Sequence, residues 1–233
     1  SKKHLKNIFI ICLHCQSQNE KSLNAYLSTL EPLIDIIFAQ LIQSKDEVII
    51  NLTAVLESCL KYRETHRLLL RSNQLIKIQH NMHASQINAS YYAINLFTQI
   101  LALNDDLTYT FIKKNYQSIM DTVNQLLEVN STEMVRLTLP IKLLQDLVEK
   151  CPSFRLIFIS DVENFRLVLR QLQRNSHQSL CTHWVQIVTE FLDEPNAQQI
   201  IKANLSNLMA LMKKYLPEND AKTYIQKLKD INR

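Results

Sequence analysis

The sequence of 233 residues contains no glycine. A protein of this length with average composition would contain about 16 glycines, so their absence is a strong constraint. Phosphate-cradling loops, dinucleotide-binding turns, nucleophile elbows and the glycine-rich loops of kinases all need backbone conformations or close approaches that glycine permits. The sequence therefore excludes these sites. Tight β-hairpins also favour glycine, whereas helices can end on asparagine, so the composition favours a helical fold.

A strong excess of one charge is also lacking. The net charge of +4 is too small for a nucleic-acid-binding face, which needs a strongly basic surface. No apolar run approaches the roughly 18 residues of a membrane span. The five cysteines are odd in number, scattered and set among apolar residues, which is typical of reduced thiols in the cytosol. We therefore predict a cytoplasmic protein with neither nucleic-acid nor membrane partners.

What the sequence does contain is a repeated helical pattern. Serines that precede long apolar helical stretches stand at Ser44, Ser85, Ser131 and Ser176, at intervals of 41, 46 and 45 residues. These intervals match the repeats of about 40–47 residues in HEAT and armadillo proteins, in which two or three helices stack around a continuous core. Ser44 is followed by Glu47, which is the spacing of a capping box at a helix start.

Each repeat is predicted to hold a long first helix, a short second helix and a third helix, which favours armadillo over HEAT repeats. The second and third helices are expected at Thr65–Arg71 and Gln74–Met82, Leu107–Lys114 and Tyr116–Leu127, Pro152–Ile159 and Val162–Leu172, and Gln198–Lys202 and Leu205–Tyr215. Asparagines follow the apolar helical runs at Asn73, Asn81, Asn104, Asn115, Asn130 and Asn175, where they can end a helix in the left-handed conformation.

The predicted fold is thus an all-α, armadillo/HEAT-like right-handed superhelix of three-helix repeats. It forms one helical-repeat domain over residues 1–233. The predicted repeats are residues 1–43, 44–84, 85–130, 131–175 and 176–216, followed by a C-terminal capping helix within residues 217–233.

Residues suited to metal or nucleophilic chemistry are few. His80 and His83 stand three residues apart on a predicted helix, and Cys12, His14 and Cys15 stand close together. A closed metal site needs four ligands, and no second pair stands at a matching spacing, so buried thiols and ordinary helix histidines are the favoured interpretation. No cysteine or serine shows a local signature of an activated nucleophile. We expect no metal, no cofactor and no enzymatic activity.

A row of arginines marks one predicted third helix. Arg166, Arg170 and Arg174 recur every four residues, so they neighbour one another on the helix surface. One interpretation is a solvated face. The other is a binding surface, because third helices of armadillo-like stacks line the concave side, where arginines can hold carboxylates in bidentate geometry. An acidic peptide or domain would suit such a row.

Short segments in a characteristic order stand at Ser160–Leu167, at Cys59–Tyr62 with Leu68–Leu70, and at Lys222–Tyr224 before Lys229–Ile231. In their order and spacing they resemble the calcium-binding protein 39 family, and the resemblance covers nearly all of the chain. It implies an armadillo-like scaffold without catalytic activity. Because members of that family carry further helices at the N-terminus, it also implies that residues are missing upstream.

The resemblance further implies a partner. In the family, the concave face binds STE20-type kinases and pseudokinases, and a C-terminal pocket takes a Trp-Glu-Phe tail from the pseudokinase. Lys142 matches a lysine beside that pocket, Phe154 matches a phenylalanine of the kinase-facing surface, and Leu169 replaces a pocket methionine. The family's Lys-Arg-Gln run is Leu137–Leu139 here, so the arginine that would hold the acidic group of the tail is missing.

We therefore predict a non-catalytic scaffold that binds a kinase or pseudokinase on its concave face. The residues expected to contact the partner are Lys142, Phe154, Arg166, Leu169, Arg170 and Arg174. The alternative is a structural component of a larger cytoskeletal or ciliary assembly, without kinase regulation.

Overall fold

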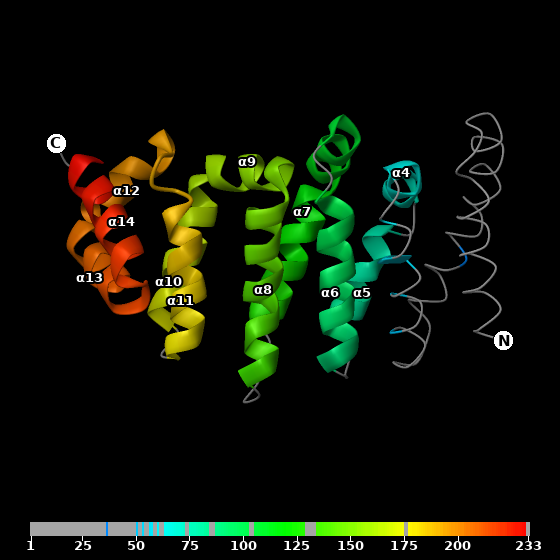
Figure 1. Cartoon of the computed structure of the whole chain (residues 1–233), viewed down its shortest axis with the longest axis horizontal. Coiled ribbons are helices and arrows are strands. Elements are labelled where there is room, and N and C mark those ends of the chain that lie inside the picture. The colour runs from blue at the N-terminus through cyan, green and yellow to red at the C-terminus, as the bar shows by residue number, and fades with distance from the viewer. Residues whose placement is uncertain are drawn as a thin grey trace. The chain divides into compact units, whose positions relative to one another are not determined.

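The computed structural model describes residues 36, 50, 53, 56, 57, 60, 63–72, 75–83, 87–102, 105–128, 134–174 and 177–231. Within these ranges every regular element is a helix (Figure 1), so the predicted all-α fold class is confirmed. By its internal contacts the chain divides into two compact units, Ser1–Val129 and Asn130–Arg233. Each unit is described by itself, and the organisation in one repeat domain stays a prediction.

Several sequence-based expectations fall on positions that the structure does not describe. They are the four serines that mark repeat starts, Glu47 of the capping box, and the predicted repeat 1–43 except Ile36. The same holds for Cys12, His14 and Cys15.

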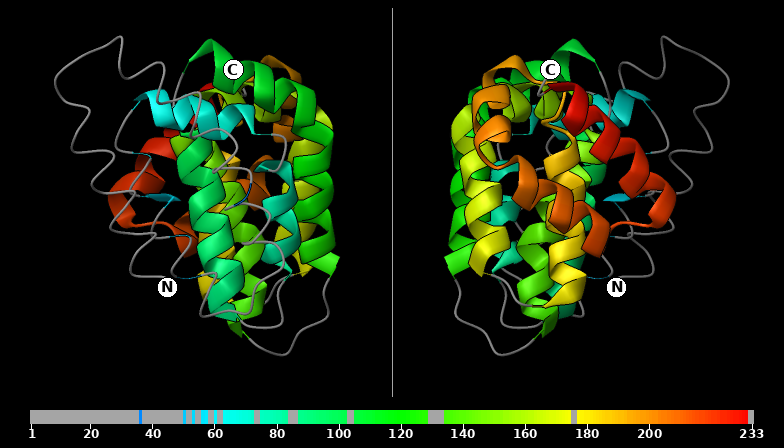
Figure 2. Two further views of the ribbon diagram at one scale, coloured as in Figure 1. Left: turned by 90° about the vertical axis from the view of Figure 1, so that its right-hand side faces the viewer. Right: turned by 90° about the vertical axis from the view of Figure 1, so that its left-hand side faces the viewer.

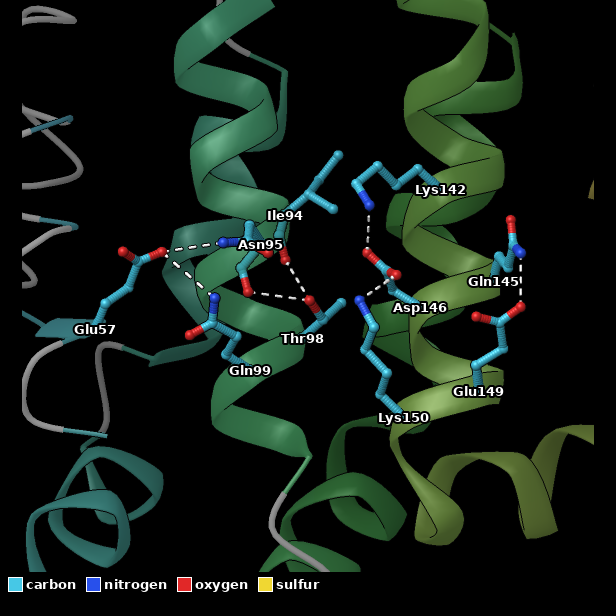
Figure 3. Close-up of polar contacts among 10 residues, drawn as sticks. All are labelled: Glu57, Ile94, Asn95, Thr98, Gln99, Lys142, Gln145, Asp146, Glu149 and Lys150. Atoms are coloured by element: carbon cyan, nitrogen blue, oxygen red, sulfur yellow. Dashed lines mark hydrogen bonds and ion pairs between the residues drawn. The ribbon is translucent and has the colours of Figure 1, made fainter. Parts of the chain in front are cut away.

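The first unit contains five described helices. They are α4 (Arg63–Arg71), η1 (Leu75–Ile78), α5 (Gln79–Met82), α6 (Ile87–Leu101) and α7 (Asp106–Glu128). Helix α6 is held to the preceding segment by Glu57, whose Oε1 accepts hydrogen bonds from Asn95 at 3.0 Å and from Gln99 at 3.5 Å (Figure 3). Most apolar side chains of α6 are buried, among them Ile94, Leu96 and Phe97, so α6 contributes much of the core of this unit.

Helix α7 is continuous, so the break predicted between Leu107–Lys114 and Tyr116–Leu127 is wrong. Asn115 does not end a helix, because its side-chain amide donates to the carbonyl oxygen of Phe111, one turn earlier, at 2.8 Å. Ile112 and Ile119, on either side of Asn115, are both buried, so the same apolar stripe continues across it. The described part of predicted repeat 85–130 therefore contains two helices, α6 and α7, in place of three.

The start of α7 is fixed by Asp105. Its Oδ1 accepts from the N–H of Thr108 at 2.9 Å and from the hydroxyl of Thr108 at 3.0 Å, which satisfies a donor of the first helical turn. Oδ2 lies 3.5 Å from Nε of Arg67 on α4. Burial alone would raise the pKa of Asp105, but the hydrogen bonds from Thr108 and the Arg67 guanidinium outweigh it and lower this pKa.

The second unit contains two three-helix repeats. The first repeat comprises α8 (Met134–Lys150), α9 (Pro152–Ser160) and α10 (Val162–Arg174). The second comprises α11 (Gln178–Thr189), the short η2 (Pro195–Ala197) with α12 (Gln198–Ala203), and α13 (Leu205–Tyr215). Each repeat has the predicted succession of a first helix, a shorter second helix and a third helix.

The chain closes with α14 (Glu218–Ile231), which begins just after Pro217 as predicted. It lies beside α13 in every view (Figures 1 and 2), and the two helices are in contact. Ala221, Ile225 and Leu228 form its buried stripe, while the lysines between them are exposed or half-buried. Helix α14 thus packs against α12 and α13, and its role as a capping helix stays a prediction.

Helices do not end on left-handed asparagines in the described ranges, where no residue has a positive φ angle. Asn81 lies inside α5 and Asn115 inside α7, which contradicts their predicted role, and the other four predicted asparagines are not described. Helix α12 instead ends at Asn204 with φ −114° and ψ 12°. The Asn204 side chain donates to the carbonyl oxygen of Ile200 at 2.9 Å, and the same oxygen accepts from the backbone N–H of Asn204 at 3.1 Å.

Four phenylalanines form the centre of the second unit. Phe154 and Phe158 of α9 stack with ring centroids 5.6 Å apart, and Phe191, after α11, lies 5.4 Å from Phe158. Phe165 of α10 lies 4.8 Å from Phe191. All four side chains are 0% exposed, as is that of Trp184 on α11. The cluster joins α9, α10 and the turn after α11.

The corner between α9 and α10 is formed by the segment Ser160–Leu167, which carries much of the family resemblance. Asp161 Oδ1 accepts from the N–H of Glu163 at 2.9 Å, and the buried Asn164 side chain donates to the Phe158 carbonyl oxygen at 2.8 Å. Asn196 of η2 donates to the Ser160 carbonyl oxygen at 3.2 Å. These polar residues therefore fix a helix corner.

Replacing Phe158 with alanine should lower the free energy of unfolding of the second unit by about 3–5 kcal/mol, because the variant leaves a cavity between two neighbouring rings. Urea titration followed by fluorescence measures this unit selectively, since Trp184 is the only tryptophan in the sequence. The matched control is Leu156→Ala on the same helix, where the side chain is 61% exposed and the change should stay within about 0.5 kcal/mol. Equal losses in the two variants would contradict the proposed core.

His66 should make the first unit sensitive to acid. Burial lowers the pKa of His66, although its Nε2 donates to the Ile100 carbonyl oxygen and Asp105 lies nearby. The unfolded chain therefore binds a proton near pH 6.5 more readily than the folded chain does. The free energy of unfolding of this unit is thus highest above this pH and decreases as the pH falls below it. Hydrogen exchange of α4 and α6 amides, corrected for intrinsic rates, should show protection falling between pH 7 and 5.

The variant His66→Gln keeps a side-chain donor but does not titrate, so its protection should fall less steeply over the same range. His177→Gln is the control, because His177 is exposed and lies in the other unit. An unchanged pH profile in His66→Gln would show that His66 does not control this response.

Candidate functional site

A groove of about 290 Å³ lies in the second unit between α10 and α13, the third helices of its two repeats. Its lining is apolar, with amide side chains among the leucines. The lining residues are Leu169, Leu172 and Gln173 of α10, and Asn204, Asn207, Leu208, Ala210 and Leu211. We call it the leucine groove. Leu169 is half-buried and Leu208 is buried, so the groove presents partly accessible apolar surface.

The predicted arginine row lies beside the leucine groove on α10. With about 100° of rotation per residue, Arg166 stands about 60° and Arg170 about 100° from Leu169, both on the side away from Leu172. Arg166, Arg170 and Arg174 are all exposed. Arg166 pairs with Glu163, which is also exposed, so that pair is weak. Within the described residues Arg170 and Arg174 have no ion pair, so the row carries positive charge next to an apolar groove.

Lys142 is engaged within its own helix. Its Nζ lies 2.9 Å from Oδ2 of Asp146, and Nζ of Lys150 lies 2.6 Å from Oδ1 of the same carboxylate (Figure 3). The Asp146 side chain is 7% exposed, whereas that of Lys142 is 33% exposed. Two lysines thus neutralise one buried carboxylate. Lys142 is not among the residues that line the leucine groove.

Phe154 does not present its ring to a partner. It is fully buried in the phenylalanine cluster, stacked on Phe158, so its side chain is a core residue in this structure. The sequence match placed Phe154 on a binding surface. A match at one position does not reveal which face of a short helix is buried, so the match could not predict this burial. Only a contribution through packing, by holding α9 against its neighbours, is compatible with this burial.

The segment Leu137–Leu139, which replaces a charged run of the family, lies in the first half of α8. Leu139 is buried, whereas Leu137 and Thr138 are half-buried. Thr138 precedes Lys142 by one helical turn, so the two side chains share a face of α8. A longer side chain at position 138 would therefore extend toward the same surface as Lys142.

The α13 side of the leucine groove was not among the predicted site residues. Leu208 and Leu211 are three residues apart, and Asn204 precedes Leu208 by four, which is the spacing of one helix face. This periodicity was sufficient to place them on one face. It did not show that the face opposes Leu169, because the pairing of α10 with α13 depends on the tertiary fold.

The described residues bear on two kinds of chemistry, metal binding and attack by a nucleophilic thiol. No group of three or more His, Cys, Asp or Glu side chains in the described ranges could hold a metal ion. Burial, and then the nearby Asp146 carboxylate, raise the pKa of Cys151 to about 12, although Lys150 partly opposes this. Its thiol is therefore protonated at neutral pH and is a poor nucleophile.

Among the helices of the described ranges, none has the length and apolar character of a membrane span.

Comparison with known protein families gives a match to the Mo25-like family over residues 1–230. The match spans both compact units and includes the leucine groove, the arginine row and the helix corner at Ser160. The Mo25 family has the armadillo-like helical solenoid fold, in agreement with the helical repeats described above. This chain belongs to the Mo25-like family, which is the calcium-binding protein 39 family that its sequence segments indicated.

Proposed function

We propose that this protein is a scaffold that binds a kinase or pseudokinase of the STE20 type through the leucine groove and the adjacent arginine row. Members of the Mo25-like family are scaffolds that bind protein partners, which sets the general class. The observation that carries the finer proposal is the apolar groove between α10 and α13, bordered by exposed arginines. Together they offer a hydrophobic contact and a set of carboxylate-binding groups on one surface.

The two features have complementary roles in this proposal. Apolar side chains of the partner would bury surface against Leu169 and Leu208, which supplies affinity. Arg170 and Arg174 would pair with carboxylates at the rim, which favours correct orientation and faster association more than it adds affinity. Guanidinium groups suit this task because they hold carboxylates in bidentate geometry.

Lys142 takes part in the proposal under one condition. Asp146 already occupies its ammonium group, so a partner carboxylate would have to share Lys142 with Asp146. Because Lys150 also pairs with Asp146, the buried carboxylate would keep one cation if Lys142 turned toward a partner. Phe154 contributes only by packing, since its ring is buried.

The absence of catalysis is part of the same proposal. The family is one of non-catalytic scaffolds, and a scaffold acts by holding its partner in one conformation. A cytoplasmic location also belongs to the proposal. Nothing in the described structure favours a cytoskeletal or ciliary assembly, so that alternative enters as an outcome of the experiment below.

Affinity purification from the native source should recover a STE20-type kinase or pseudokinase with this protein. A partner set of cytoskeletal or ciliary proteins without any kinase would support the alternative and contradict the proposal.

The double variant Arg170→Glu with Arg174→Glu should weaken binding of the purified kinase partner by at least about tenfold, because it places negative charge where carboxylates are expected. Isothermal titration calorimetry at two salt concentrations measures the effect. The matched control is Lys222→Glu with Lys229→Glu on α14, which makes the same charge change at exposed positions of the same unit. If the control weakens binding equally, the arginine row has no specific role.

Binding of a Trp-Glu-Phe peptide should be weak in this protein and should improve in Thr138→Arg. The unmodified chain lacks the arginine that pairs with the acidic group of the tail, and loss of one partner of such a pair typically costs about 2–5 kcal/mol. An arginine at position 138 lies one turn from Lys142 and restores a guanidinium on that face. Peptide titration monitored by fluorescence anisotropy distinguishes the outcomes: low-micromolar binding by the unmodified chain, or no gain in Thr138→Arg, would contradict this mapping.

A further inference from the structure

A second groove, of about 300 Å³, lies in the first unit between η1–α5 and the C-terminal half of α7. Its walls correspond to the third helices of predicted repeats 44–84 and 85–130, just as α10 and α13 are the third helices of the repeats in the second unit. One wall carries Lys77, His80 and His83, and the other carries Ser118 and Asp121. We call it the histidine groove. It includes the histidine pair that the scaffold function leaves unexplained.

The floor of the histidine groove contains a buried donor without an acceptor. Gln79 lines the groove and is 8% exposed. Its Oε1 accepts from the hydroxyl of Ser118 at 3.1 Å, which fixes the amide, but its Nε2 has no hydrogen-bond partner among the described residues. Leaving a buried N–H unpaired is unfavourable, but Nε2 is itself shielded from solvent, so an acceptor in the groove reaches it only if neighbouring side chains move.

The charged and titratable groups that line the groove also favour an acceptor. Lys77 is positive, and each imidazole can donate an N–H to an anion in its neutral or charged form. Burial, and then the positive charge of His80, lower the pKa of His83 in the empty groove. Asp121 opposes these groups, although its Oδ1 already accepts from the side-chain amide of Gln117 at 2.9 Å.

We propose that the histidine groove binds a carboxylate side chain of a protein partner, and that this binding becomes stronger as the pH falls from 8 to 6. The carboxylate accepts from the two exposed imidazoles, while Lys77 contributes positive charge. The inference rests on the proposed function only in taking the occupant to be a segment of a protein.

The direction of the pH dependence follows from linkage. A bound carboxylate favours the protonated form of a neighbouring imidazole, so the pKa of His83 is higher in the complex than in the empty groove. Binding therefore takes up protons, and the affinity rises as the pH falls between these two values. Because the occupant is taken to be a segment of a protein, its acceptor is a carboxylate side chain, and inorganic phosphate is the alternative that the competition below tests.

The test uses the full chain and a fluorescein-labelled, terminally blocked hexaglutamate peptide, with anisotropy titrations at pH 6.0 and 8.0. The unmodified chain should bind the peptide about tenfold more tightly at pH 6.0, the factor that one charge-assisted hydrogen bond typically supplies. His80→Gln with His83→Gln should remove that difference. The control His177→Gln, at an exposed histidine of the second unit, should retain it.

Equal affinities at the two pH values in the unmodified chain, or an unchanged pH dependence in the double histidine variant, would overturn the proposal. Inorganic phosphate that competes as well as free glutamate would overturn the assignment to carboxylates. A measurement on the unmodified chain covers the case in which the double variant does not fold. By NMR, the pKa of the His83 ring should rise on saturation with peptide, and no rise would overturn the proposal.

Failure of this inference is distinguishable from failure of the proposed function. The same titration in Arg170→Glu with Arg174→Glu removes any contribution of the arginine row but should leave the pH dependence intact, because that dependence belongs to the first unit. Conversely, if the unmodified chain shows no pH dependence, the inference fails, while kinase binding at the leucine groove remains as proposed.

Discussion

Packing among buried aromatic rings is the interaction on which the second unit depends. Helix α9 has nine residues and α10 has thirteen, and helices of this length are marginal in water on their own. Phe154, Phe158, Phe165 and Phe191 hold them against the turn after α11. The position of α10, and hence the width of the leucine groove, therefore depends on side chains that no partner can touch.

The charged groups separate into those that maintain the fold and those that remain at the surface. Asp105 and Asp146 are carboxylates with little exposure, and each is neutralised by groups of its own unit, a threonine with an arginine in one case and two lysines in the other. A buried carboxylate needs such partners, because burial without them is costly. Arg170 and Arg174, in contrast, are exposed and remain available to acidic groups in solution.

The sequence was sufficient to predict the helical fold and the family, but not the local details of the site. Absence of glycine and the spacing of apolar residues are properties of the whole chain, so they predicted the class reliably. The break at Asn115 was predicted from one residue, and the apolar stripe from Ile112 to Ile119 overrode it. Phe154 was assigned by its match alone, while its burial depends on contacts with Phe158 that only the folded chain makes.

The two grooves were hidden from sequence reasoning for a related reason. Leu169 and the α13 leucines are distant in the sequence, as are His83 and Asp121, and they line common grooves only because the chain folds their helices together. The histidine pair did stand out in the sequence. The state of the neighbouring Gln79 amide could not be predicted, because its burial and its hydrogen bond from Ser118 are set by the folded structure.

Equivalent positions in the repeats thus produce two cavities of nearly equal volume with opposite chemical character, one lined by leucines and the other by histidines and amides. The volume is a property of how the helices pack, and the chemical character is a property of a few side chains. Evolution can therefore change what each repeat recognises by substituting those side chains alone. A solenoid built in this way can acquire new ligands one repeat at a time while its backbone and core remain constant.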